Sequence, residues 1–143
     1  MYTGLQHLHS YFAYLLLAIL AFSLLYAIVM FVRKKPFTEK VRKVALVGFI
    51  ATHIQLLVGL VLYVISPVGL TNLGADAMGD TMARLYALEH PLTMIIGIVL
   101  VSIGYIKAKK PGDDVRRFRN IILFYALGLI VILIRIPWQV WPS

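Results

Sequence analysis

The sequence predicts an all-α integral membrane protein, with one bundle of four transmembrane helices over residues 1–143. Composition is the first indication. Of the 143 residues, 61% are hydrophobic and mean hydropathy is +0.87, whereas a soluble domain needs more polar surface. The second indication is four apolar stretches, each close to the roughly 20 residues that a helical crossing requires. Only helices satisfy their own backbone hydrogen bonds in lipid at this spacing, so we expect no separate soluble domain.

The four apolar stretches follow one another with short polar connections between them, and they cover residues 8–32, 44–66, 85–106 and 121–138. The first is too long for the apolar part of a cleavable signal peptide, and no basic segment precedes it. We therefore expect it to remain as a membrane helix. The fourth is short, and its helix can extend back to Val115 through arginines that reach the lipid headgroups.

Basic side chains are concentrated in two of the connections. Residues 33–43 and 107–119 carry twelve of the 14 lysines and arginines, whereas Arg84 and Arg135 lie at the opposite ends of their helices. The positive-inside rule places both basic connections in the cytoplasm. It therefore predicts a multi-pass protein of the bacterial inner (cytoplasmic) membrane, N-out and C-out, with periplasmic termini. This topology explains the net charge of +8, and no nucleic-acid partner is expected.

The outer connection and its flanks have the composition of a membrane boundary. Residues 67–83 are rich in glycine, which predicts a loop with a short interfacial turn. Tyr86, Trp138 and Trp141 fall at the same boundary, as an aromatic belt predicts. The chain has no cysteine, which excludes disulfides, thiolate metal sites and c-type haem attachment.

Four histidines are the main functional indication: His7, His9, His53 and His90. His7 is expected at the headgroups, whereas the others fall on three different predicted helices, where ionisable groups are expensive and usually functional. Neutral imidazole is an axial ligand of haem iron, and a four-helix bundle holds such a cofactor between facing helices. The pattern predicts b-type haem with two of these three histidines on the iron. The alternatives are histidines that only bond across helices, or a copper or other metal site.

The depths of the three histidines leave their pairing open. Counting at 1.5 Å per residue from the cytoplasmic basic residues places His53 at about 15 Å, His90 at about 25 Å and His9 at about 34 Å. Axial ligands of one haem need similar heights, although helix tilt removes several ångströms of such a gap. His90 is the common partner, and both His9–His90 and His53–His90 remain.

Further residues could help to hold a haem. Gly97 shares a helix face with His90 and keeps that face shallow, either for a flat macrocycle or for close helix packing. Arg84 and Arg135 are suited to the two haem propionates, or else they reach lipid headgroups. Gln55 could orient a ligand histidine or bond across helices.

Glu89 precedes His90 and points about 100° away from it on a helix. It could hydrogen-bond a ligand histidine on another helix, or pass protons during quinol chemistry. The alternative is an interfacial acid that pairs with Arg84 or Arg135.

The segments "HSYFAY", "THIQLLVGLVLY", "LEHPLTM" and "RIPW" resemble a family of small four-helix membrane proteins from Bacteroidota that are labelled cytochrome b-like. The resemblance covers nearly the whole chain. It implies His9, His53 and His90 as candidate ligands and Arg135 as a site residue. The chain is also similar to half of haem A synthase, where four helices hold a haem between two histidines. It departs from that family's acidic–histidine–arginine motif, because Pro91 follows His90.

The expected function is therefore electron transfer by a membrane protein that binds haem b, in or beside a respiratory or quinol pathway. Its expected partners are the lipid bilayer, quinol as a redox partner, and other respiratory membrane subunits. Two alternatives are a haem- or porphyrin-modifying membrane enzyme, and a cofactor-free structural subunit of a membrane complex.

Overall fold

The computed structural model describes residues 1–141 and is all-helical, without strands in this range. Four of its helices are long and apolar enough to cross a membrane, which confirms the predicted all-α class with four candidate membrane helices. Pro142 and Ser143, the end of the predicted 1–143 domain, lie outside the described residues. In chain order the elements are α1 (Tyr2–Val32), α2 (Glu39–Ile65), η1 (Leu70–Asn72), α3 (Ala75–Gly79), α4 (Thr81–Arg84), η2 (Leu85–Glu89), α5 (His90–Lys109) and α6 (Asp114–Ile134).

The long helices differ from the predicted spans mainly at their ends. α1 begins at Tyr2 rather than at residue 8, and the third span runs through α4, η2 and α5 as one helix over Thr81–Lys109. α6 begins at Asp114, in line with the predicted extension through its arginines, but it ends at Ile134 rather than at Trp138. Pro137 explains the early end, because the residue before a proline is disfavoured in the α conformation.

Side-chain caps define where three helices begin. The hydroxyl of Thr38 accepts a hydrogen bond from the backbone N–H of Val41 at the start of α2. The carboxylates of Asp80 and Asp113 do the same for α4 and α6, at 2.7 and 3.2 Å. Each cap satisfies a backbone N–H that the first helical turn leaves without a partner. The caps therefore favour helix starts at these three positions.

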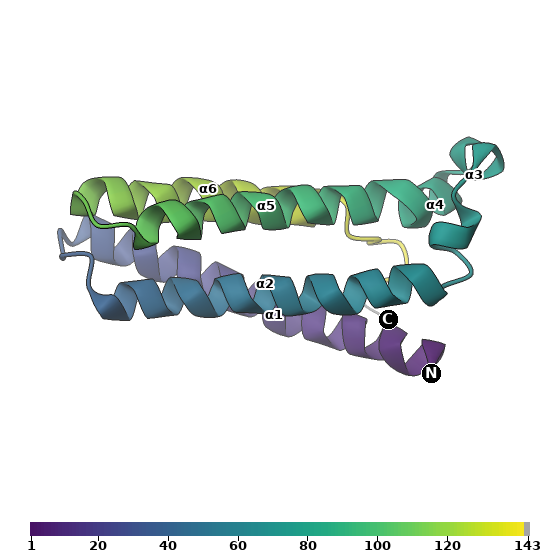
Figure 1. Cartoon of the computed structure of the whole chain (residues 1–143), viewed down its shortest axis with the longest axis horizontal. Coiled ribbons are helices and arrows are strands. Elements are labelled where there is room, and N and C mark those ends of the chain that lie inside the picture. Colours follow the sequence, from purple (N-terminus) through teal and green to yellow (C-terminus); the bar gives the residue numbers. More distant parts are fainter. Residues whose placement is uncertain (142–143) are drawn as a thin grey trace.

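The four long helices pack as the corners of a square. α1 packs against α2 and α6, and α5 packs against the same two helices, so α1 and α5 occupy opposite corners. Figure 1 shows α1 slanting across the bundle, with its N-terminal end and the segment after α6 toward the same end as α3 and α4. We call this the far end. The opposite, basic end holds the α1–α2 and α5–α6 connections.

The packed core lies toward the basic end of the bundle. Two hydrogen bonds join helices there: the Tyr125 hydroxyl donates to the Ala45 carbonyl at 2.6 Å, and the Ser23 hydroxyl donates to the Val44 carbonyl at 3.0 Å. Such bonds hold helices together where lipid offers no polar partner. The buried cluster comprises Leu20, Ala27, Phe37, Val41, Ala45, Val101, Tyr105, Ala108, Phe118, Ile121, Tyr125 and Ile132.

Glycines bring α5 and α6 close together. A Cβ on Gly97 would lie 2.7 Å from Cγ1 of Ile132 and 3.1 Å from the Gly128 carbonyl oxygen, and one on Gly128 would lie 2.7 Å from Cγ2 of Val101. The glycine face of the third span was expected either to hold a flat macrocycle or to pack closely against another helix, and the structure shows close helix packing. Gly97, predicted to bind a cofactor, faces α6.

Candidate functional site

A cavity of about 500 Å³ opens between the helices toward the far end, away from the packed core. All four long helices and the segment after α6 line it with mostly apolar side chains. Its size falls in the range of about 300–1,000 Å³ that is usual for small-molecule sites. The lining residues on which the site depends are His9, Gln55, Gly59, His90, Met94 and Trp141.

His9 and His90 face each other in this cavity from opposite corners of the bundle. Their ring centroids are 6.2 Å apart, and the ring planes are nearly perpendicular at 83°. The depth count had separated them by about 9 Å. That count assumed parallel helices, whereas α1 slants across the bundle (Figure 1). The slant allows His9 on α1 to lie beside His90 on α5. Of the two pairings that the sequence left open, the structure brings His9 and His90 together.

The protonation of the His90 ring follows from its hydrogen bond. Nδ1 lies 2.8 Å from the backbone carbonyl oxygen of Arg135, and a carbonyl only accepts, so Nδ1 carries the hydrogen. In the neutral ring the lone pair is then on Nε2. This is the arrangement of a histidine whose second nitrogen is oriented for metal binding.

Pro91 explains why His90 points in this direction. The N–H of His90 bonds to the carbonyl of Leu85, five residues back, in the π-turn η2. Proline has no N–H, and its ring crowds the carbonyl four residues before it, here that of Ala87. The Tyr63 hydroxyl donates to this Ala87 oxygen at 2.7 Å. The turn therefore widens without leaving a buried carbonyl unpaired.

The His9 ring packs against α2, and one of its nitrogens has no hydrogen-bond partner. Its Nδ1 is buried without a hydrogen-bond partner, and so is Oε1 of Gln55. Nε2 of Gln55 donates to the backbone carbonyl of His9 at 2.8 Å. A Cβ on Gly59 would lie 3.1 Å from Cε1 of the His9 ring, so this glycine makes room for the imidazole. Buried polar groups are rarely left unpaired, so these two atoms on the wall of the cavity need an explanation.

His53 does not line this cavity, and both of its ring nitrogens contact polar atoms of the protein. Its Nδ1 is 2.7 Å from the Phe49 carbonyl, and its Nε2 is 3.2 Å from the Ser102 hydroxyl on α5. Its ring also packs against Phe49, with 4.1 Å between centroids. Both ring nitrogens therefore serve contacts within and between helices, the structural alternative for this residue. His7 is exposed and stacks on Tyr11.

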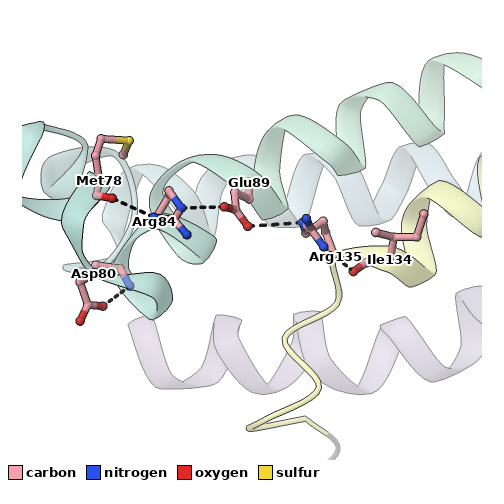
Figure 2. A network of polar contacts seen from close by, with 7 residues as sticks. Met78, Asp80, Arg84, Glu89, Ile134 and Arg135 are labelled. Carbon is pink, nitrogen blue, oxygen red and sulfur yellow. Dashed lines mark hydrogen bonds and ion pairs between the residues drawn. The ribbon is translucent and has the colours of Figure 1, made fainter.

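Two arginines at the far end share one carboxylate, as Figure 2 shows. Oε1 of Glu89 accepts from Nε of Arg84 at 2.7 Å, and Oε2 lies 3.3 Å from Nε of Arg135. Arg84 also donates to the Met78 carbonyl at 2.8 Å. The pairing alternative for Glu89 is thus observed with both arginines. Neither arginine lines the cavity, and Arg135 acts on His90 through its backbone.

Among residues 1–141, no group of three or more His, Cys, Asp or Glu side chains could hold a metal ion. In comparisons with known proteins, no family model matches the chain, and no curated protein or solved structure matches it significantly.

Proposed function

We propose that the protein binds haem b through His9 and His90 and transfers electrons. The spacing of the two rings carries the proposal. Metal–imidazole bonds are about 2.0–2.1 Å long, so two imidazoles on opposite sides of one metal have ring centroids roughly 6 Å apart. The His9 and His90 centroids are 6.2 Å apart, on helices at opposite corners of the bundle.

The remaining features of the cavity fit a haem better than a bare metal ion. Structural zinc usually has four protein ligands, whereas in haem the macrocycle supplies the four in-plane nitrogens and the chain needs only two. The hydrogen bond from Nδ1 of His90 to Arg135 leaves Nε2 for the iron. Apolar side chains form most of the wall, as expected around a flat hydrophobic macrocycle.

Each part of the chain has a defined task in this proposal. His9 and His90 would supply the two imidazole ligands to the iron, and the apolar lining would exclude water from it. Arg84 and Arg135, which are 36% and 46% exposed in their side chains, supply positive charge for the propionates, and Glu89 fixes their positions. A bound haem supplies reversible one-electron chemistry.

The cellular setting is part of the same proposal. The two basic connections lie at one end of the bundle (Figure 1). The residues that line the cavity lie toward the other end. With the basic connections in the cytoplasm, the haem lies in the periplasmic half of the inner membrane, with both termini outside. There it would exchange electrons with quinol or with neighbouring respiratory subunits.

Optical spectra of three variants test this function. We expect the protein expressed with added haem and purified in detergent to show a Soret band that shifts on reduction, with sharp α and β bands. His9→Ala and His90→Ala should each lose this low-spin spectrum. His53→Ala is the matched control and should keep it, because His53 does not line the cavity.

The opposite results are equally clear. A flat spectrum from the wild-type protein would favour the cofactor-free structural subunit. Retention of the low-spin spectrum in His90→Ala, at full haem occupancy, would remove His90 from the ligand set.

A further inference from the structure

The wall of the cavity behind His9 holds two unpaired polar atoms. Nδ1 of His9 and Oε1 of Gln55 are both buried without a hydrogen-bond partner, and Gln55 is only 8% exposed. Both residues line the cavity. The amide is not free to turn away, because its Nε2 is bound to the backbone carbonyl of His9 at 2.8 Å. The unpaired atoms therefore belong to two residues that already contact each other.

The packing of the His9 ring shows which of its nitrogens is left for a metal. A Cβ on Gly59, one turn along α2 from Gln55, would lie 3.1 Å from Cε1 and 3.6 Å from Nδ1 of His9. The Nδ1 edge of the ring thus faces α2, and Nε2 is the nitrogen available for iron. A neutral imidazole that binds through Nε2 carries its hydrogen on Nδ1, and this buried N–H then requires an acceptor.

The other ligand already has such an acceptor. Nδ1 of His90 donates to the Arg135 carbonyl at 2.8 Å, which fixes the orientation of that ring. A side-chain amide offers one donor and one acceptor, and residue 9 presents a backbone carbonyl and a ring N–H. Gln55 matches both groups of His9 at once.

We propose that Gln55 is the positioning residue for His9: its Nε2 holds the His9 carbonyl, and its Oε1 accepts from Nδ1–H once Nε2 binds iron. This assignment rests on the proposed haem function. Partners of this kind fix the ring orientation of a ligand histidine and raise its basicity. A more basic ligand stabilises ferric over ferrous iron, so the bond lowers the reduction potential.

Haemin titration and redox potentiometry of two Gln55 variants test the assignment. Gln55→Leu removes the acceptor, and we expect roughly 10- to 100-fold weaker haemin binding and a higher midpoint potential. Gln55→Glu retains an acceptor oxygen at the same reach. It should bind haemin more tightly than Gln55→Leu and have a potential no higher than that of the wild type.

Thr52→Val is the matched control. Thr52 is fully buried on the same helix, bonds to the Phe49 carbonyl and does not line the cavity. We expect this variant to retain the wild-type potential. If Gln55→Leu keeps the wild-type affinity and potential while His9→Ala loses low-spin haem, the assignment of Gln55 is wrong and the haem function stands.

Two other outcomes also overturn the assignment. Equal losses in Gln55→Leu and Gln55→Glu with an unchanged potential would show that Gln55 acts only in packing. A wild-type protein that binds no haemin would remove both this assignment and the proposed function.

Discussion

His90 owes its orientation to the proline that follows it. Without an N–H at position 91, the Ala87 carbonyl takes its hydrogen from Tyr63 on α2, and the chain forms a π-turn at Leu85–Glu89. Such turns are uncommon and are frequently found at functional sites. The same residue that breaks the α-helical pattern thus directs an imidazole toward the centre of the bundle.

Pro91→Ala separates this role from stability. Alanine restores the N–H for Ala87 and is about 3 kcal/mol more favourable than proline in a helix interior, so the variant should be no less stable. We expect His90 to rotate away and the low-spin haem signal to fall strongly, as measured by haemin titration. Pro111→Ala, in the connection at the basic end, should bind haemin normally. Unchanged binding by Pro91→Ala would show that the π-turn does not orient His90.

Sequence reasoning identified the ligand candidates but left their pairing and their surroundings open. His90 was the common partner, but residue counts along a straight helix could not choose between His9 and His53, because they do not encode the slant of α1. Arg135 was predicted as a site residue for its guanidinium group, whereas the hydrogen bond of its backbone carbonyl with His90 was missed. Gly59 and Tyr63 were missed as well, although Gly59 shares a helix face with Gln55 and so carried a weak signal.

At the scale of elements, the four helices were predictable because membrane crossings require long apolar runs. The residues at which these helices end were harder to predict. The close contact of α5 with α6 was one of two readings for Gly97, and the sequence alone had no means to show which helix would cover that face. The early end of α6 follows from Pro137, which leaves residues 135–141 free to cross the far end and line the cavity.

Gly97→Ala tests the contact between α5 and α6. Its Cβ would meet Ile132 at 2.7 Å, and overpacking of this kind costs typically about 1–3 kcal/mol. We expect a lower unfolding temperature in detergent. Gly4→Ala is the control, because a Cβ on this helical glycine meets nothing within 4 Å. Equal stability of the two variants would contradict the close packing described for α5 and α6.

The whole molecule is divided along its length into a packed half and a hollow half. The buried cluster lies toward the basic end, where helices also bond to each other through Tyr125 and Ser23. The cavity and the His9–His90 pair lie toward the far end. One half therefore stabilises the bundle, and the other holds the cavity in which we propose that haem binds. Sequence hydropathy did not show this division, because apolar residues line the cavity as well as the core.

The orientation of this asymmetric bundle is a separate prediction. A reporter that is active only in the periplasm should be silent when inserted at Gly112 and active when inserted at Gly74. Both glycines lie in connections where a Cβ would meet nothing within 4 Å, so the insertions should be tolerated. The opposite pattern would place the cavity in the cytoplasmic half and overturn the assignment from the positive-inside rule.

The most direct test of the central claim is the identity of both axial ligands in the wild-type protein. Near-infrared magnetic circular dichroism and low-temperature electron paramagnetic resonance of the ferric form report these ligands. We predict one low-spin haem per chain with two imidazoles, and the large-g resonance typical of nearly perpendicular rings, in line with the 83° between His9 and His90. A high-spin iron, or a histidine–thioether signature with Met94 of the same cavity, would contradict the account.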